Sequence, residues 1–424
     1  MNVCFFNRSY WPDQAATGQL LTELAEDLVA CHGAEVTVVA GRALNPVEET
    51  ASSWWPAVQE ERRGVRVLRA NGTILRPRRF AARATNYVTY LASATVASRR
   101  IGRPDVVVSL TDPPILGRIA LQAARRLRVP FVFLCEDIFP EVGALVEDFR
   151  NEWVNASLDR LNRSLLREAD AIVALGECMR RRLVEEKGAD PRRVRVIHNW
   201  ADCEAIRPGS KDNAFARAHG LVDRFVVMHS GNVGLSQNLD VLVEAAARLR
   251  SRPEIVIAVV GDGAKRRGLE EDAARRGLEN VRFFPYQPKE MLHDSFATAD
   301  AFLVSLKPGL EGYIVPSKLY GILAAGRPYV AAVDRSCEVA TVAQDHGCGV
   351  WAEPGDPDAL AAAIASLCDG RTETRAMGER ARAAAARFDR REAVRAYHGL
   401  FEHLVAARSA ASPFPASSRL ETSR

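Results

Sequence analysis

Residues 309–328, GLEGYIVPSKLYGILAAGRP, place a carboxylate, a helix start and a cation within one short stretch. Pro316 and Ser317 precede an apolar run, and because Pro and Ser are favoured where helices begin, the pattern predicts a helix starting near Ser317. The unpaired amides of a first helical turn and the positive end of the helix dipole attract anions. Lys318 adds a full positive charge, and Glu311 lies just before it, facing whatever is attached to the anion. The stretch therefore predicts a site for an anion such as a diphosphate.

Three glycine-bearing turns, each following a buried strand pattern and preceding a helix pattern, are further candidates for phosphate contact. They contain Gly18 after the strand 2–6 and its loop 7–18, Gly231 and Asn232 after the strand 225–229, and Gly263 after the strand 254–260. A glycine lets the backbone approach a ligand closely. For Gly18 an ordinary turn glycine is the alternative, and the lone G-x-G at Gly263 is a weak signal. The order of strand, glycine turn, helix and strand is typical of a Rossmann-like fold, and it occurs in both halves of the chain.

An acidic segment follows the predicted strand 130–135 and begins with Glu136 and Asp137. Ligands of open α/β sheets gather at the carboxyl ends of the strands. Asp137 is therefore a candidate for orienting or deprotonating an acceptor hydroxyl. The alternative, equally open from the sequence, is that Asp137 caps the helix that follows.

The stretch around Glu311 resembles the donor-site signature of the family 4 retaining glycosyltransferases, in particular the PSKLY-x-x-LAAG-x-P variant of bacterial surface-polysaccharide transferases of the colanic acid and O-antigen type. The resemblance implies that Glu311 is the first of two signature glutamates and holds hydroxyls of the donor sugar. It also places Gly312, Pro316 and Ser317 in the donor site. Gly321 stands where the family has its second glutamate, which usually holds the ribose.

The resemblance covers about 400 residues and implies further donor contacts. Asn232 and Gln237 stand where the wider family has an Arg and a Lys that grip the diphosphate, which shifts the electrostatic role to Lys318 and the helix start. The surface-polysaccharide subgroup shows a similar G-N-x-G pattern. The loop around Tyr286 resembles the one that holds the nucleobase, and Gly18 matches one glycine of a Gly-Gly pair that relatives place against the diphosphate.

A chain of 424 residues is too long for one ordinary core, which favours two domains. The helical and strand periodicity breaks at residues 199–209, which resemble the family's I-x-N-x-x-D hinge. The expected fold class is α/β, with two Rossmann-like domains facing a central cleft, the architecture called GT-B. The expected parts are an acceptor domain (1–198), a nucleotide-sugar donor domain (199–386), a helix that crosses back to the first domain (387–408) and a disordered tail (409–424).

Composition limits the chemistry and the location. The eight cysteines form no C-x-x-C pair and no Cys/His spacing of the kind that zinc needs, so neither a metal site nor a cofactor is expected. The first residues lack the pattern of a signal peptide, and no run of 18 apolar residues occurs. We therefore expect a cytoplasmic protein, at the inner face of the plasma membrane if it meets a bilayer.

Positive charge is concentrated in the first half of the chain. Residues 62–128 contain fifteen Arg and two Asp, with no Lys or Glu. Within them, residues 76–100 combine Arg with Phe80, Tyr87 and Tyr90, a pattern that favours peripheral contact with an anionic membrane. An ordinary helix with a solvated Arg rim is the alternative. Nucleic acid is not an expected partner because no recognition motif accompanies the charge.

By its resemblance, the chain is expected to move a sugar from a nucleoside diphosphate donor, UDP-sugar being favoured, to a hydroxyl acceptor with retention. A lipid-linked sugar is the expected acceptor, in the synthesis of surface polysaccharide or glycolipid. Because no carboxylate pair is placed for double displacement, front-face attack assisted by the leaving phosphate is expected, with Glu311, Asp137 and Lys318 as catalytic residues. Two alternatives are a nucleotide-sugar 2-epimerase of the same architecture and a non-catalytic sugar-binding protein.

Overall fold

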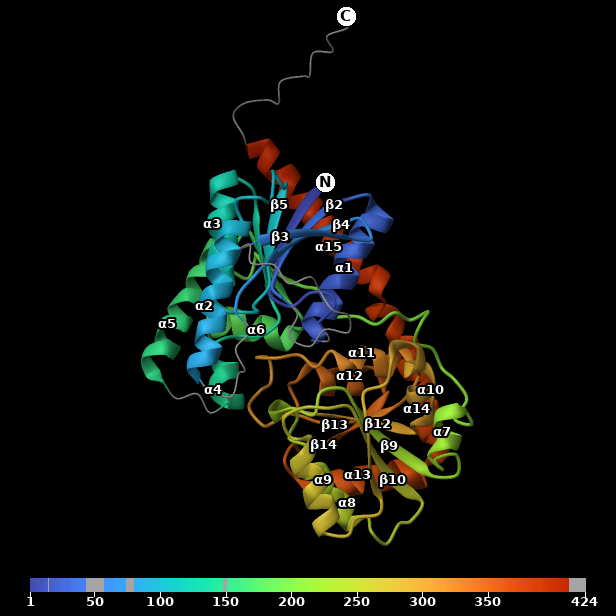
Figure 1. Cartoon of the computed structure of the whole chain (residues 1–424). Coiled ribbons are helices and arrows are strands. Elements are labelled where there is room, and N and C mark those ends of the chain that lie inside the picture. Colours follow the sequence, from blue (N-terminus) through green and yellow to red (C-terminus); the bar gives the residue numbers. More distant parts are fainter. Residues whose placement is uncertain (14, 43–56, 74–79, 148–150, 412–424) are drawn as a thin grey trace, which may run out of the picture. The chain divides into compact units, whose positions relative to one another are not determined.

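The computed structural model describes residues 1–13, 15–42, 57–73, 80–147 and 151–411, which divide into two compact units (Figure 1). The first unit comprises residues 1–134, 164–173 and 394–424, and the second comprises residues 135–163 and 174–393. The predicted boundary between residues 198 and 199 stays a prediction.

The first sheet has the strand order β3-β4-β2-β1-β5-β6-β7-β8. Its strands are β1 (Asn2–Phe6), β2 (Glu35–Ala40), β3 (Ala57–Arg62), β4 (Val65–Ala70), β5 (Val106–Ser109), β6 (Phe131–Cys135), β7 (Ala171–Ala174) and β8 (Val194–Val196). Central strands such as β5 and β6 are apolar and buried throughout, as expected for parallel strands covered on both faces. The edge strand β3 was not predicted. It pairs antiparallel with β4, and from Val58 to Arg62 half-buried and exposed residues alternate along it.

Helices connect these strands. They are α1 (Ala16–His32), α2 (Phe80–Ala97), α3 (Leu116–Leu127), α4 (Glu141–Glu147), α5 (Glu152–Glu168) and α6 (Glu177–Glu185). Of the predicted basic aromatic segment 76–100, residues 76–79 lie outside the described residues. Within α2, Tyr87 and Val88 are exposed and Tyr90 is buried.

The second sheet has the strand order β11-β10-β9-β12-β13-β14, and all of its pairs are parallel. Its strands are β9 (Phe225–Ser230), β10 (Ile255–Val260), β11 (Val281–Phe284), β12 (Ala301–Ser305), β13 (Tyr329–Ala332) and β14 (Gly349–Ala352). The helices are α7 (Ala214–Ala218), α8 (Asp240–Arg248), α9 (Arg266–Arg275), α10 (Leu292–Thr298), α11 (Lys318–Ala324), α12 (Glu338–His346), α13 (Pro357–Asp369), α14 (Arg371–Ala385) and α15 (Arg390–Ala411).

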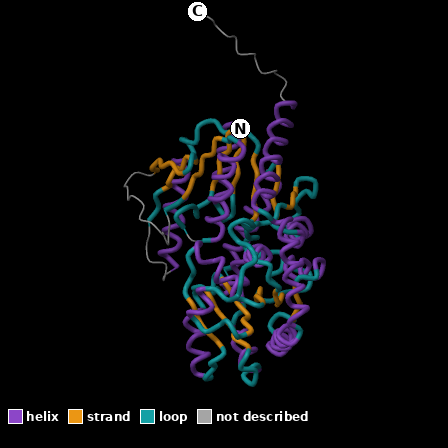
Figure 2. Tube along the Cα trace, turned by 90° about the vertical axis from the view of Figure 1, so that its right-hand side faces the viewer, coloured by secondary structure: helices purple, strands orange, loops and turns teal. Residues whose placement is uncertain are grey.

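Helices lie on both faces of this second sheet (Figures 1 and 2). Two hydrophobic clusters result, one on each side of the strands. One contains Val256 and Ala258 of β10 with residues of α11 and α12, and the other contains Ile255 and Ile257 with residues of α8 and α13. Because successive side chains of a strand point to opposite faces, the fully apolar sequence IVIAVV of β10 supplies both clusters.

The last helix, α15, carries residues from Val394 onward into the first unit. Phe401 of α15 packs edge-on against Phe5 of β1, with 6.1 Å between the ring centroids, and both side chains are fully buried. Of the predicted disordered tail 409–424, residues 409–411 end α15, and residues 412–424 lie outside the described part of the chain.

No helix in the described part of the chain has the length and apolar character needed to span a bilayer. All eight cysteines are free thiols. Cys31 at the end of α1 is exposed, Cys203 is half-buried, and the other six are buried.

Candidate functional site

The second sheet changes its direction of winding between β9 and β12, since β10 and β11 extend from one side of this pair and β13 and β14 from the other. Ligands of open α/β sheets bind in the crevice outside the carboxyl ends of the strands at such a point. The turns after β9 and β12 carry Gly231 and the stretch from 306 to Lys318. The predicted anion-binding stretch therefore lies at the switch point of its unit.

The turns after β9 and β10 are pressed together so closely that glycine is required. A Cβ atom on Gly261 would lie 1.9 Å from the carbonyl oxygen of Gly231, and one on Gly263 would lie 2.5 Å from the carbonyl oxygen of Val233. Gly261 and Gly263 also have φ angles of 142° and 154°, in the region that other residues rarely adopt. The two predicted turns thus form one continuous backbone surface.

Asn232 and Gln237 stabilise this surface rather than adding charge. The amide of Asn232 lies beside both Gly234 and Gly263, since Cβ atoms built on those glycines would lie 2.6 Å from its Nδ2 and Oδ1, respectively. The Gln237 Oε1 accepts a hydrogen bond of 3.0 Å from the Gly234 N–H. Both side chains therefore hold the turn in shape.

Lys318 begins α11, close to the predicted start at Ser317. Its Nζ lies 3.3 Å from Nε2 of His229, the fully buried residue near the end of β9. Burial lowers the pKa of Lys318 to about 7. Within the described part of the chain Lys318 has no carboxylate partner. A bound anion would therefore stabilise the charged form of this mostly buried amine.

His229 was not predicted as a site residue. Its Nε2 lies 3.2 Å from the carbonyl oxygen of Asn232, a contact in which Nε2–H donates, and its buried Nδ1 has no hydrogen-bond partner in the described residues. Burial first, and then the charge of Lys318, hold the pKa of His229 well below its ordinary value. A neutral imidazole that presents N–H to the Asn232 carbonyl cannot also accept a proton from Lys318. His229 therefore leaves the Lys318 charge without compensation.

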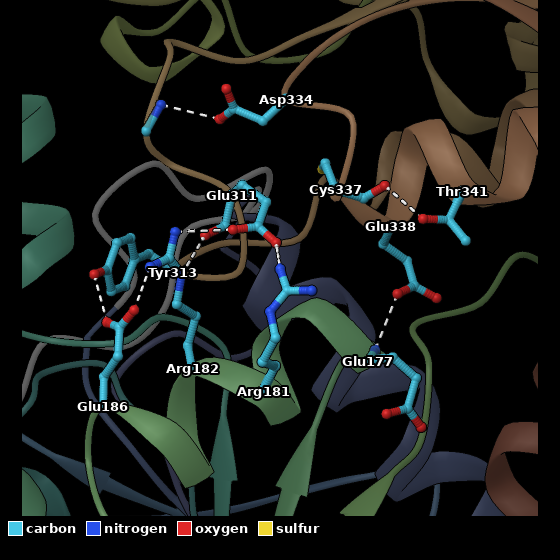
Figure 3. A network of polar contacts seen from close by, with 11 residues as sticks. Glu177, Arg181, Arg182, Glu186, Glu311, Tyr313, Asp334, Cys337, Glu338 and Thr341 are labelled. Atoms are coloured by element: carbon cyan, nitrogen blue, oxygen red, sulfur yellow. Dashed lines mark hydrogen bonds and ion pairs between the residues drawn. The ribbon is translucent and has the colours of Figure 1, made fainter.

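Glu311 is buried, with 3% of the residue exposed, although it lies in a loop. Figure 3 shows its carboxylate between two arginines of α6. Arg181 donates to Oε1, while Arg182 donates to Oε2 over 2.9 Å and to the Glu311 carbonyl over 3.1 Å. In this structure both carboxylate oxygens are engaged by arginine. A donor sugar that hydrogen-bonds to Glu311 would have to use the same two carboxylate oxygens that the arginines already contact.

The loop after Glu311 is fixed on its other side by the segment that carries Asp137. Asp137 and Ile314 form an antiparallel bridge, and Ile138 N–H donates 2.9 Å to the Tyr313 carbonyl. A Cβ atom on Gly312 would lie 2.7 Å from the Cys178 carbonyl oxygen, so this residue is a packing glycine. The structure thus brings Glu311, Gly312 and Asp137 together.

Asp137 does not cap the next helix, because α4 begins four residues later at Glu141. Its neighbour Glu136 was overlooked as a candidate. Burial, and then the charge of Asp137, raise the pKa of Glu136 to about 8, while a hydrogen bond from Asn199 opposes the shift. A carboxyl group whose pKa lies near neutral pH is suited to exchanging a proton.

Tyr286 and Gly18 are two further predicted site residues. Tyr286 follows β11 and is 49% exposed. Gly18 lies in the first unit, whereas the other ten predicted residues lie in the second. The expected loop 7–18 is wrong at its end, because α1 begins at Ala16 and Gly18 lies in its first turn. A Cβ atom there would lie 3.2 Å from the Tyr10 nitrogen, so close packing accounts for this glycine.

A cavity of about 760 Å³ lies beside the Glu311 pair in the second unit. Arg181 lines it together with His198 and Glu338. The Glu338 carboxylate accepts 3.0 Å from the Glu177 N–H and lies 3.4 Å from Nδ1 of His198, and burial raises the pKa of Glu338. Arg181 therefore connects Glu311 to a polar chamber large enough for a sugar.

Nowhere in the described residues do three or more His, Cys, Asp or Glu side chains gather as metal ligands would.

Several known proteins have similar sequences. Residues 211–384 match the family Glycosyl transferases group 1, and residues 16–200 match the Glycosyl transferase 4-like domain. The Probable glycosyltransferase WbjE of Pseudomonas aeruginosa is 31% identical over 293 residues, which are 67% of this chain and 70% of that protein. The Putative colanic acid biosynthesis glycosyl transferase WcaI of Escherichia coli K12 is 26% identical over 377 residues, which are 86% of this chain and 91% of that protein.

Among solved structures, Alr3699/HepE of Anabaena in complex with UDP matches with a TM-score of 0.73 and 17% identity, covering 95% of this chain and 100% of that one. At this identity the likeness shows the fold alone. The expected fold class, α/β with two Rossmann-like domains of the GT-B type, is confirmed.

Proposed function

This chain belongs to the family 4 glycosyltransferases, and from that premise we propose that it transfers a hexosyl group from a nucleoside diphosphate sugar to a hydroxyl acceptor with retention. We favour a UDP-sugar as the donor, and the relative solved in complex with UDP supports this choice. The similarity to a protein named for colanic acid biosynthesis supports a role in making surface polysaccharide or glycolipid. A lipid-linked sugar is the acceptor that we propose.

The observation that carries the proposal is the amine of Lys318 at the switch point of the second sheet, which has no carboxylate partner among the described residues. A diphosphate placed against the turn at Gly231 would meet this amine, since a Cβ atom on Gly231 would lie 3.9 Å from Lys318 Nζ. Preorganised donors of this kind stabilise the charge that develops on a leaving group. In this proposal Gly231, Asn232, Gly263 and the Pro316-Ser317 helix start contact the nucleotide diphosphate, and Gly18 is a further proposed contact.

The proposed reaction is a front-face displacement. The acceptor oxygen forms its bond to the anomeric carbon as the bond from that carbon to the diphosphate oxygen breaks, and the acceptor proton passes to the departing diphosphate. Lys318 stabilises that diphosphate, Glu311 holds donor sugar hydroxyls, and Asp137 orients the acceptor. Gly312 fixes the position of Glu311, and the loop at Tyr286 holds the nucleobase.

Ribose binding would differ from that of the wider family. A Cβ atom on Gly321 would lie 3.2 Å from the Phe296 ring, so the helix face where relatives carry a glutamate is packed against an aromatic side chain here. We propose that backbone groups of the turn at Gly263 replace that glutamate.

A panel of UDP- and GDP-sugars tests the proposal. A true donor at about 100 times its dissociation constant should stabilise the chain by about 2.7 kcal/mol in thermal unfolding. With the stabilising donor and a lipid-linked sugar, NMR of the product should show the anomeric configuration of the donor. Conversion of the donor alone into its 2-epimer would instead identify an epimerase, and binding without turnover with any acceptor would identify a sugar-binding protein.

We also propose that α2 contacts the anionic inner face of the plasma membrane. Val88 is 65% exposed and Tyr87 is 39% exposed, and the sequence around this helix is rich in Arg. Apolar side chains beside cations favour the interface of an anionic bilayer.

A further inference from the structure

A second cavity, of about 410 Å³, lies in the second unit, at the opposite end of the strands from the proposed donor site. It is bordered by Phe225, the first residue of β9, by Asp300 just before β12, and by Pro328 just before β13. These are the amino ends of the strands. At about 3.3 Å per residue, the four steps along β9 from Phe225 to His229 separate this cavity from His229 by about 13 Å.

Cationic side chains dominate the lining. Those of Lys211, Arg327, Arg371, Arg375 and Arg382 face two carboxylates, those of Asp300 and Glu379, so cations exceed carboxylates by three. The volume is within the range of small-molecule sites.

Among the described residues, Lys211 is the one member of this set that forms a salt bridge with a carboxylate, and the same Asp300 also partly offsets the charge of Arg327. Lys211 pairs with Asp300, whose carboxylate also accepts 2.7 Å from the Val226 N–H. Arg382 instead donates to carbonyl groups, at 3.2 Å to Ile206, 2.7 Å to Ala324 and 3.0 Å to Cys203. Carbonyl groups satisfy its hydrogen bonds but leave its full charge in place.

Arg327 is in a similar position. It donates 2.9 Å to the Gly209 carbonyl and 2.6 Å to the Ala297 carbonyl, while its Nε is buried and has no partner in the described residues. Burial lowers the pKa of Arg327. The pKa of Lys211 is also lowered, by burial first and further by the charges of Arg327 and Arg371, against the pull of Asp300. These cations therefore repel one another inside a partly desolvated space.

The first turns of α14 add two charges on one helix face. Arg371 and Arg375 are four residues apart, and like charges at that spacing destabilise a helix. Arg371 lies over the Phe225 ring, with 5.6 Å to its centroid. Neither arginine has a carboxylate partner in the part of the chain that the structure describes. Both arginines are exposed, so an anion from solution can reach them.

We propose that this cavity is a second binding site, separate from the donor site, for a small phosphate-bearing anion. The planar guanidinium groups of Arg371 and Arg375 suit bidentate contact with phosphate oxygens, and the buried Nε of Arg327 supplies a further donor. The same chemistry is offered by a soluble diphosphate and by a lipid phosphate headgroup. This inference stands apart from the proposed transferase activity, because none of its residues belongs to the donor site.

Inorganic pyrophosphate, titrated calorimetrically into the full chain in phosphate-free buffer, is the direct probe. Because the proposed donor site also takes a diphosphate, the titrations use the K318M background, in which R371Q/R375Q should bind pyrophosphate at least tenfold more weakly than K318M alone. A matched control, R192Q/R267Q, removes two exposed arginines elsewhere in the same unit and should bind like K318M alone. K318M removes the donor-site amine and should retain this binding, which separates the inference from the proposed function.

The cavity variant should fold, because neither arginine has an ion-pair partner, and its melting temperature in phosphate-free buffer should equal or exceed that of the wild type. Flotation with phosphatidylcholine vesicles containing phosphatidylglycerol distinguishes the two phosphate sources. If R371Q/R375Q loses pyrophosphate binding, the ligand of the cavity is a soluble anion. If the variant loses only vesicle binding, the ligand is a lipid phosphate headgroup. Equal behaviour of the cavity variant and the control in both assays would overturn the inference.

Discussion

At the scale of single residues, Lys318 gives the sharpest prediction. Substitution by Met removes the amine but keeps a chain of similar length, so the fold should persist while UDP binding weakens by at least tenfold, or about 1.5–3 kcal/mol for a lost charge-assisted hydrogen bond. Calorimetric titration of UDP measures this change. Lys265, whose Nζ pairs with Asp240 over 2.9 Å, provides the control, and equal losses in K318M and K265M would remove Lys318 from the site.

The lowered pKa of Lys318 predicts a pH dependence of donor binding. Its amine is half-protonated near pH 7 in the free chain, and a bound diphosphate favours the ammonium form, so binding raises that pKa. UDP affinity should therefore fall as pH rises above about 7, and binding at pH 8 should take up close to one proton. Titrations in two buffers with different ionisation enthalpies count that proton. An uptake of zero in both wild type and K318M would contradict the assignment.

Glu311 should matter to stability as well as to turnover. Replacement by Gln removes a buried charge between Arg181 and Arg182, and breaking such a pair leaves cations uncompensated, so unfolding free energy should fall by about 3 kcal/mol. Urea denaturation measures the loss. The exposed pair of Glu271 and Arg267 supplies a control, because E271Q should change stability by less than about 0.5 kcal/mol. An E311Q chain as stable as E271Q would show that the two arginines do not depend on this carboxylate.

The sequence located Glu311 but not its partners. Arg181 and Arg182 lie about 130 residues earlier in the chain, and no local pattern distinguishes them from other surface arginines of a helix. His229 was missed for a similar reason, since it reads as one more residue of a buried strand. Local motifs indicate backbone geometry and charge. Which side chains pair over long sequence separations depends on tertiary packing, which a local sequence pattern does not show.

At the scale of elements, two Gly→Ala changes should have opposite effects on stability, one in the turn after β10 and one within α9. Gly261→Ala would bring a methyl group 1.9 Å from the Gly231 carbonyl at a φ of 142°. Both strain and displacement of the turn should follow, with loss of stability and of UDP binding. Gly268→Ala, within α9, has open space around the new Cβ and should stabilise the chain by about 0.5–1 kcal/mol.

Thermal unfolding with and without UDP compares the two variants. If Gly261→Ala kept wild-type stability and the full UDP-dependent shift, the two turns would not form the rigid surface described above.

Strands covered on both faces were predictable because burial makes them uniformly apolar, as in β10 with IVIAVV. The edge strand β3 escaped prediction since only every second residue of AVQEER is withdrawn from water. The start of α1 was placed too late because Gly18 was interpreted as a loop glycine, whereas close packing against Tyr10 explains it. A glycine alone does not distinguish a turn from a tight helix contact.

At the scale of the whole molecule, the basic first half predicts membrane association through α2. Val88→Glu places a carboxylate on an exposed site, so it should leave stability unchanged within about 0.5 kcal/mol. Flotation with vesicles containing phosphatidylglycerol should fall for this variant. Leu235→Glu, at an exposed site of the second unit, is the control, and equal flotation of both variants would argue against contact through α2.

The two-sheet architecture was predictable because two series of buried strands, separated by a polar break, recur along the chain. The division of the chain between the units was less accessible. Residues 394–411 pack with the first unit, as Phe401 does against Phe5, although they follow the second in sequence. Which unit the last helix packs against depends on which apolar surface it fits. The sequence pattern of α15 shows only that one face of the helix is apolar.

The unequal burial of the eight thiols has a practical consequence. A maleimide dye added to the native chain should attach almost entirely at Cys31, since six of the other thiols are shielded and Cys203 is half-shielded. One fluorophore on α1 would thus be installed without engineering, and its anisotropy would report when a vesicle or a nucleotide slows the tumbling of the first unit.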